Sequence, residues 1–225
     1  MAFGYDRFNL VASLGVDRLW RDALIKKAVL ALNASETVLD IGTGTGDLIF
    51  ELYAQLPLLK RDCKFFGLDF SKEMLKVAMV KGKRRPGSKY SLFLQGDAQF
   101  IPLRSESVDL VVSAFALRNM KKQVFNILLE LQRVLKPNGK LLLLDMYAPQ
   151  GKLLKALHRV YLCTMLGLAG RAIFAKRWAG SYLPETIFNF WRPEEFVQML
   201  EKTGFVDVGY HTLWGGMAIV HEAKK

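Results

Sequence analysis

The sequence has little of what marks a secreted, membrane-spanning or disordered protein. Its 225 residues include only two cysteines, Cys63 and Cys163, which excludes a disulfide scaffold and favours a reducing compartment. Its most apolar stretch, Val160 to Gly170, has 11 residues, whereas a membrane-spanning helix needs about 20. No basic segment followed by an apolar one stands near the start, so we expect no secretion signal.

What is present fits one globular domain with a basic surface. Hydrophobic residues make up 51% of the chain, which excludes intrinsic disorder and allows a sizeable core. Lys and Arg number 32 against 21 Asp and Glu, which gives a formal net charge of +11. Such an excess fits nucleic acid, an anionic membrane, acidic ligands or solubility alone, and the total does not distinguish them.

Short apolar, β-branched runs alternate with helical patterns over the first two thirds of the chain. The run from Thr37 to Ile41 predicts a first buried strand, and Ser71 predicts the N-terminal cap of a helix through Lys81. Further strands are predicted at 64–69, 90–94, 108–113 and 140–145, and further helices at 47–56 and along the apolar face Val124, Ile127, Leu128, Leu131, Val134 and Leu135, with a turn at 136–139. With right-handed crossovers, this order predicts a doubly wound α/β sheet with helices on both faces.

The C-terminal part departs from this alternation. Pro193 and the two acids after it begin one more helix, which Gly204 ends. Two further strands, 206–213 and 217–223, are separated only by Trp214-Gly-Gly216 and should pair as an antiparallel hairpin. A Rossmann-like sheet of about seven strands closed in this way is associated with class I methyltransferases, whereas a dinucleotide dehydrogenase usually continues with parallel strands.

A segment without any acidic residue follows the fifth predicted strand. Between Met146 and Leu183 it carries Lys152, Lys155, Arg159, Arg171, Lys176 and Arg177. Its place above the carboxyl ends of the strands, where such folds bind ligands, predicts an inserted helical lid. We therefore expect a single domain over 1–225, with an N-terminal helical cap (1–35), a cofactor-binding core (36–145), the basic amphipathic lid (146–190) and the final helix and hairpin (191–225).

Three glycines at the end of the first strand give the strongest chemical signal. Gly42, Gly44 and Gly46 let the backbone approach a ligand at the start of a helix, where N–H groups are free. The spacing does not complete the Gly-x-Gly-x-x-Gly fingerprint of pyrophosphate binding. Asp47 beside the loop would repel a pyrophosphate but accept an amino acid ammonium or a sulfonium.

Two more acids follow the second and third strands. Asp69 stands where a carboxylate accepts hydrogen bonds from ribose hydroxyls, and Asp97 with the N–H of Ala98 stands where an adenine amino group would be recognised. A nucleoside without phosphates and with a cationic amino acid end describes S-adenosylmethionine. The alternative is that the loop is only a tight turn and Asp69 a helix cap.

Several motifs together resemble a known family. They are Leu39 to Leu48, Gly67 to Leu75, Gln95-Gly-Asp-Ala98 with Ile101-Pro-Leu103, Phe115-Ala-Leu-Arg-Asn119, Arg133 to Pro137, Tyr5 to Asn9, Ser13 to Arg21, and Gly215-Gly with His221. Over nearly its full length the chain resembles the quinone-biosynthesis C-methyltransferases of menaquinone and ubiquinone formation, the UbiE/MenG/COQ5-like class. Ala114 departs from the serine common there, and Gly180-Ser-Tyr-Leu183 departs from the family's Tyr-Arg-Tyr-Leu.

The resemblance implies a cofactor, S-adenosylmethionine, which becomes S-adenosylhomocysteine, and it implies no metal. The residues expected to bind the cofactor are Asp40, Gly42, Thr43, Gly44, Thr45, Gly46, Asp69, Phe70, Met74, Asp97, Ala98, Ala114 and Phe115.

The resemblance also implies the acceptor, a polyprenyl quinol: demethylmenaquinol or the 2-methoxy-6-polyprenyl-1,4-benzoquinol of ubiquinone synthesis. Arg118 is then expected to stabilise the deprotonated phenol and Asn119 to fix the second ring oxygen. Tyr5, His158 and Tyr182 are weak candidates for a general base, and a water relay is an equal alternative. The alternative for Arg118 is an ordinary salt bridge at a strand end.

Two other hypotheses stay open, namely another small-molecule or RNA methyltransferase on the same fold, and a non-catalytic binding module. Nucleic acid C-methylation needs a thiolate, whereas Cys63 and Cys163 both fit core positions, so we expect no nucleic acid partner.

The basic, apolar lid instead predicts peripheral contact with an anionic membrane, at the cytoplasmic face of the cytoplasmic membrane. The alternative is a solvated lid face. A homodimer is also an open expectation.

Overall fold

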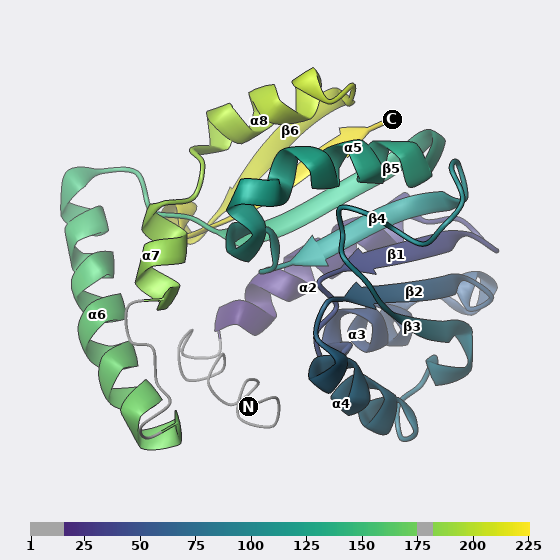
Figure 1. Ribbon diagram of the computed structural model, residues 1–225, viewed down its shortest axis with the longest axis horizontal. Helices are drawn as coiled ribbons and strands as arrows, with labels where there is room; N and C mark the ends of the chain where they lie inside the picture. Colours follow the sequence, from purple (N-terminus) through teal and green to yellow (C-terminus); the bar gives the residue numbers. More distant parts are fainter. Residues whose placement is uncertain (1–15, 175–181) are drawn as a thin grey trace.

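The computed structural model describes residues 16–174 and 182–225, which are built around one seven-stranded sheet (Figure 1). The strand order is β3-β2-β1-β4-β5-β7-β6, and β7 pairs antiparallel with both β5 and β6, whereas β1 to β5 are parallel. The strands are β1 Thr37–Ile41, β2 Lys64–Asp69, β3 Ser91–Gln95, β4 Val108–Ala114, β5 Leu135–Met146, β6 Val206–Leu213 and β7 Ala218–Lys224. The predicted doubly wound sheet with a final antiparallel hairpin is confirmed.

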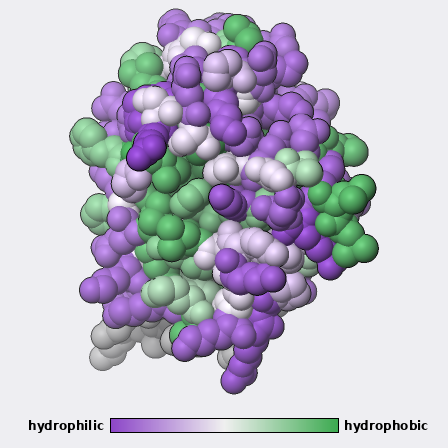
Figure 2. Space-filling view, turned by 90° about the vertical axis from the view of Figure 1, so that its right-hand side faces the viewer, coloured by the Kyte–Doolittle hydropathy of each residue, from purple (hydrophilic) through white to green (hydrophobic). Residues whose placement is uncertain are grey.

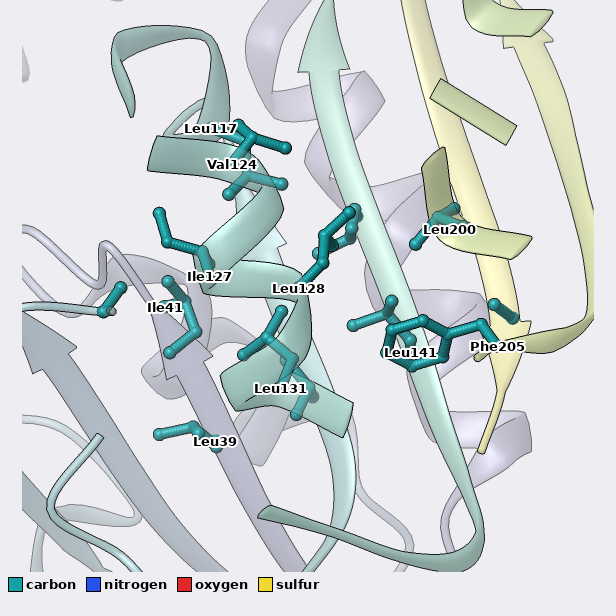
Figure 3. Packing of buried hydrophobic residues seen from close by; sticks show 14 of the residues in the cluster. Leu39, Ile41, Leu117, Val124, Ile127, Leu128, Leu131, Leu141, Leu200 and Phe205 are labelled. Carbon is teal, nitrogen blue, oxygen red and sulfur yellow. The ribbon is translucent and has the colours of Figure 1, made fainter. Parts of the chain in front are cut away.

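Helices cover both faces of the sheet. They are α2 Val16–Ala31, α3 Asp47–Gln55, α4 Lys72–Gly82, α5 Val124–Val134, α6 Lys152–Phe174, α7 Tyr182–Phe188 and α8 Pro193–Lys202. One buried cluster joins the sheet to α2 and α3, and a second joins it to α5 and α8. Because successive strand residues face opposite ways, Val38 belongs to the first cluster and Leu39 to the second. In Figure 3, Leu39 and Ile41 of β1 lie beneath Ile127 and Leu131 of α5.

The predicted boundaries hold within a residue or two except at one place. The sequence predicted a turn at 136–139, whereas β5 runs without interruption from Leu135. Val108 of β4 pairs with Leu135, and Leu110 pairs with Lys140, so the register shifts between them. Asn138, within this shift, has a positive φ of 62°. The polar turn residues therefore bulge out of a longer strand, because the apolar residues on both sides of them stay paired.

The described parts of the segment predicted as a lid contain α6 and α7 and lie at one end of the molecule (Figure 1). In Figure 1, α6 stands beyond the carboxyl ends of the strands with α7 between it and the sheet. Leu162 of α6 and Ile187 of α7 are buried in the first cluster, whereas Leu153, Leu157 and Val160 are exposed. Within residues 16–174 and 182–225, no helix is long and apolar enough to cross a bilayer.

Removing a buried side chain from α5 should destabilise the fold. Leu131 is fully buried against the sheet, so Leu131→Ala should lower the free energy of unfolding by about 2–5 kcal/mol, measured by urea denaturation. Leu129→Ala on the same helix is the matched control, because Leu129 is 45% exposed. Equal losses in the two variants would contradict the assignment of the buried face.

Candidate functional site

A cavity of about 530 Å³ opens at the carboxyl ends of β1, β2, β3 and β4. It lies at β1, which has β2 on one side and β4 on the other. In such sheets the connections on the two sides of this point run over opposite faces of the sheet, and a crevice forms between them. Of the thirteen residues expected to bind a cofactor, twelve line this cavity, namely Asp40, Gly42, Thr43, Gly44, Thr45, Asp69, Phe70, Met74, Asp97, Ala98, Ala114 and Phe115.

Gly46, the thirteenth, is not among the lining residues and has a packing role. It precedes α3 with a φ of +79°, and a Cβ there would approach Phe50 to 2.9 Å and Phe93 to 3.0 Å. Gly44 differs, because its φ is +56° and only the Gly42 carbonyl, at 3.9 Å, lies near a Cβ position. The backbone at Gly44 is therefore open for close approach by a ligand.

Asp69 connects the glycine loop to the neighbouring strand. Its Oδ2 accepts a hydrogen bond from the N–H of Gly44 at 2.8 Å, and its Oδ1 accepts one from the N–H of Ser71 at 2.8 Å. Ser71 in turn caps α4 by accepting from the N–H of Met74. The carboxylate is fixed at the cavity wall, and each of its oxygens keeps a lone pair that a ligand hydroxyl can use.

Asp97 and Phe70 also line the cavity. Asp97 accepts hydrogen bonds from the N–H of Gln99 at 2.9 Å and from the Gln99 side chain at 3.2 Å, so its position is also fixed. The Phe70 ring is 78% exposed at the rim. An exposed aromatic ring and a fixed carboxylate in one cavity lining suit a flat heterocycle that carries an amino group.

Asp40 is the buried acid at the head of the loop. It is 1% exposed, and its Oδ2 has no hydrogen-bond partner among the described residues. Burial raises the pKa of the Asp40 carboxyl to about 7, and the positive charge of Arg21 acts in the opposite direction. A buried carboxylate oxygen that lacks a hydrogen-bond partner is suited to bind a cationic group that enters the cavity.

Asp47 does not supply the uncompensated charge that the sequence suggested. Both of its carboxylate oxygens accept from the Lys81 ammonium, at 3.0 and 3.1 Å, and Lys81 also contacts the Thr45 hydroxyl. This ion pair neutralises Asp47 within the protein. The residue best placed to meet a ligand cation at the loop is therefore Asp40.

Arg118 and Asn119 are neighbours in the chain but point to different surroundings. Arg118 is buried, does not line the cavity, and donates from Nη1 to Asp145 at 2.8 Å and to the Phe115 carbonyl at 2.6 Å. Its backbone N–H also donates to Asp145, at 2.9 Å. Asn119 does line the cavity. The buried ion pair considered as the alternative for Arg118 is thus present.

Of the three candidates for a general base, only His158 has a described side chain, and it does not line the cavity. Tyr5 falls outside the described residues, and for Tyr182 only the backbone is described, as the first residue of α7. His158 is buried on α6 against the Phe188 ring, with 6.0 Å between the ring centroids, and burial lowers its pKa.

Sequence reasoning missed some lining residues, above all Arg21, Met120 and Gln123. Arg21 belongs to a stretch that carried the resemblance, but nothing in its own segment predicts that α2 packs beside the glycine loop.

Within the described part of the chain, no three His, Cys, Asp or Glu side chains are grouped as a metal site.

The donor set fits S-adenosylmethionine. It offers an open glycine backbone, a fixed carboxylate for hydroxyls, a second one for an amino group, and a buried acid without a partner for a cation. No phosphate-binding arrangement is present along this lining, since its acids outnumber its single basic residue, Arg21.

Comparison with known proteins agrees with this geometry. Residues 1–225 match the model of the ubiE/COQ5 methyltransferase family. A demethylmenaquinone methyltransferase of Protochlamydia amoebophila (strain UWE25) is 35% identical over 217 residues, which cover 96% of this chain and 88% of that protein. A ubiquinone/menaquinone biosynthesis C-methyltransferase UbiE of Citrifermentans bemidjiense is 34% identical over 221 residues, with coverage of 98% and 91%.

The fold alone is shared with a solved SAM-dependent methyltransferase from Aquifex aeolicus. The TM-score is 0.64 at 23% sequence identity, and the match covers 91% of this chain and 88% of that one.

Binding of S-adenosylhomocysteine should depend on pH through Asp40. At pH 6 a carboxyl with a pKa of about 7 is mostly protonated, and it must lose its proton to meet the ligand's ammonium. We expect the affinity measured by calorimetry to rise about tenfold from pH 6 to pH 8. Calorimetry at pH 6 in buffers of different ionisation enthalpy should also detect release of a proton.

Asp40→Asn is the control for this dependence. The amide does not titrate, so the variant should bind more weakly than the wild type at pH 8 and equally at both pH values. A wild-type affinity that does not change between pH 6 and pH 8 would contradict the role given to Asp40.

Proposed function

Because the chain belongs to the ubiE/COQ5 methyltransferase family, we propose that it transfers a methyl group from S-adenosylmethionine to a ring carbon of a polyprenyl quinol. The chain is an S-adenosylmethionine-dependent methyltransferase. The observation that carries the proposed acceptor is the match over the full length to relatives named for demethylmenaquinone and for ubiquinone/menaquinone synthesis. These names support a naphthoquinol, a benzoquinol or both.

When bound, S-adenosylmethionine supplies an electrophilic methyl group on a sulfonium. An acceptor carbon becomes nucleophilic when the neighbouring phenol loses its proton. Positioning accounts for most of the catalysis such a reaction needs, and it can lower a barrier by roughly 7–11 kcal/mol. We propose that Asp69 fixes the ribose, Asp97 and Ala98 the adenine, and the backbone at Gly44 the amino acid end.

We propose that the acceptor ring enters between Phe115 and Asn119 beneath the lid. Asn119 lines the cavity and donates to the Phe115 carbonyl at 3.4 Å, so its amide lies beside the entry. Phe115 takes a positive φ of 61°, which costs energy for a residue with a side chain. The Arg118–Asp145 pair holds the Phe115 carbonyl, so we give Arg118 a positioning role.

The role in which Arg118 meets the phenolate directly stays a prediction. It requires the guanidinium to turn from Asp145 toward the ring. Tyr5 and Tyr182 likewise stay predicted contributors to the acceptor side.

The proposed acceptor can be tested with purified protein and labelled S-adenosylmethionine. Demethylmenaquinol and the prenylated methoxybenzoquinol, each in detergent under reducing conditions, should acquire label at a ring carbon. The oxidised quinones should not, since they lack a phenol to ionise. Asn119→Ala should lower kcat at least about tenfold and leave affinity for S-adenosylhomocysteine within about twofold, whereas Lys122→Ala, an exposed neighbour, should change neither.

Labelling of RNA instead of either quinol would favour the RNA methyltransferase alternative. Tight binding of S-adenosylhomocysteine without transfer to either quinol would favour the non-catalytic module.

We also propose that α6 rests on an anionic bilayer from which the quinol enters, at the inner face of the cytoplasmic membrane. Leu153, Leu157 and Val160 are exposed beside the exposed Lys152, Lys155 and Arg159, a combination that suits the interface of an anionic membrane. Trp214 at the tip of the β6–β7 hairpin is 55% exposed. That tip adjoins α6, since a Cβ on Gly215 would lie 3.5 Å from Leu154.

The net charge does not by itself identify this surface, because a second basic region lies elsewhere. Residues 57–90 contain ten Lys and Arg against three Asp and Glu. The exposed Lys83, Arg84 and Arg85 precede β3 at the end of the sheet opposite α6. Figure 2 shows that end, which is mostly hydrophilic with separate hydrophobic patches.

These two regions allow a test at equal charge. The variant Lys152→Glu/Lys155→Glu/Arg159→Glu should bind anionic vesicles about a hundredfold more weakly, because each basic side chain at the surface contributes about 1 kcal/mol. The variant Lys83→Glu/Arg84→Glu/Arg85→Glu should bind within about twofold of the wild type. Wild-type binding should weaken as salt rises.

An equal loss of vesicle affinity in the two variants would show that binding depends on total charge and not on α6. If the wild type does not bind vesicles, or binds them equally at all salt concentrations, the membrane proposal is wrong. Sedimentation of the same wild-type protein in solution tests the homodimer expectation.

A further inference from the structure

Two of the motifs that carried the resemblance lie outside the cavity lining but meet each other in space. Ile101-Pro-Leu103 lies in the loop between β3 and β4, and Arg133 lies near the end of α5. The cavity takes 96–99 from the same loop as part of its lining. Residues 96–107 form no helix or strand, so the position of Asp97 at the cavity wall depends on the contacts that hold this loop.

The Arg133 guanidinium binds the backbone of the loop. Its Nη2 donates to the Ile101 carbonyl at 2.9 Å, and its Nη1 donates to the Leu103 carbonyl at 3.0 Å. Arg133 also donates to Glu130, at 2.7 and 2.8 Å, and Glu130 accepts from the N–H of Ile101 at 2.8 Å. The hydrogen bond from Arg133 lowers the pKa of the Glu130 carboxyl, so the pair is ionised at neutral pH. One ion pair of α5 therefore holds three backbone groups of the loop.

A second contact from α5 reaches Asp97 through Gln99. The Asn126 Nδ2 donates to the Gln99 Oε1 at 3.3 Å, and the Gln99 Nε2 donates to the Asp97 Oδ2 at 3.2 Å. Because the oxygen of the Gln99 amide faces Asn126, its nitrogen is the end that faces Asp97. The backbone N–H of Gln99 donates to the Asp97 Oδ1 at 2.9 Å. Donors on both of its oxygens thus fix the carboxylate, which still has lone pairs for a further donor.

The three α5 residues lie on one side of the helix. Asn126, Glu130 and Arg133 have the spacing i, i+4 and i+7, which brings side chains together on an α-helix. The loop also buries Ala98 and Ile101 in the cluster that α5 forms with the sheet. The loop and α5 are therefore held together by an apolar contact and by the polar contacts of these three side chains.

We propose that Asn126, Glu130 and Arg133 set the base specificity of the cofactor site by holding Asp97 in place as a hydrogen-bond acceptor. A purine with a 6-amino group presents an N–H donor to this carboxylate, whereas a 6-oxo purine presents an oxygen that the carboxylate repels. The proposal rests on S-adenosylmethionine as the cofactor and on Asp97 as its adenine contact. It adds three positioning residues on α5 that do not line the cavity.

Two ligands that differ in the purine alone test this role. S-inosylhomocysteine has an oxo group where S-adenosylhomocysteine has the 6-amino group. By calorimetry, the wild type should prefer S-adenosylhomocysteine at least about thirtyfold. Asn126→Ala should reduce this preference about three- to tenfold, and the exposed position of Asn126 makes a folding defect an unsuitable explanation.

Gln132→Ala is the matched control on the same helix. The Gln132 Nε2 donates to the Gly204 carbonyl at 3.3 Å, which is the length of the Asn126 hydrogen bond, but this contact does not involve the loop. The variant therefore loses a similar surface hydrogen bond and should keep the preference within about twofold of the wild type.

Two variants of Arg133 separate positioning from stability. Arg133→Ala should reduce the preference about tenfold or more. Arg133→Lys keeps the charge, but one ammonium cannot replace the fork that binds Glu130 and two carbonyls, so its preference should fall between those of the wild type and Arg133→Ala. A loss of folded protein lowers the apparent affinity for both ligands equally, so the ratio of the two affinities reports the loop and not the stability.

An unchanged preference in both Asn126→Ala and Arg133→Lys would overturn the proposal, as would a loss in Gln132→Ala as large as that in Asn126→Ala. These results differ from a failure of the cofactor site. A wild type that binds both ligands equally would remove the contact between Asp97 and adenine, and a wild type that binds neither would overturn the site itself.

Discussion

The carboxylate of Asp69 is the constraint on which the site depends. It accepts from the N–H of Gly44 and from the N–H of Ser71, so one side chain ties the loop after β1 to the start of α4 at the end of β2. Without it the loop would keep its glycines but lose a fixed position relative to the neighbouring strand. Hydrogen bonds to a carboxylate, such as the two that hold the loop, are stronger than hydrogen bonds between neutral groups. The same carboxylate can still accept hydrogen bonds from the hydroxyls of a ligand.

The fold was largely predictable because its determinants are local. The β-branched runs at Thr37–Ile41 and Val108–Ala114 are strands, and the apolar periodicity after Val124 is α5, because these segments bury one face or both against near neighbours. The bulge at 136–139 was not predictable in the same way. Polar turn residues are typical of a strand end, and only the pairing of Leu135 with β4 shows that β5 continues through them.

The site was predictable where a motif stands at a strand end and unpredictable where it depends on packing between distant segments. The glycine loop and the acids after β2 and β3 line the cavity as expected. The partners of charged residues could not be foreseen: Asp47 pairs with Lys81, 34 residues away, and Arg118 with Asp145, 27 residues away. The pair of Asp47 neutralises a group that the sequence presented as a free charge, and the pair of Arg118 is the salt bridge that the sequence left open as an alternative.

Charge is therefore arranged in two layers. In the sequence the excess of +11 is concentrated in residues 146–190 and 57–90, whereas the described lining of the cavity holds acids and one arginine. The cavity suits a cationic cofactor, and the membrane contact of the basic lid is a proposal. The central claim is that the glycine loop, Asp69 and Asp97 bind S-adenosylmethionine in one orientation. A crystal structure with S-adenosylhomocysteine tests it most directly: we expect the ribose hydroxyls within hydrogen-bond distance of Asp69 and the adenine beside Asp97 and Ala98. A nucleoside bound in the reverse orientation, or outside this cavity, would contradict it.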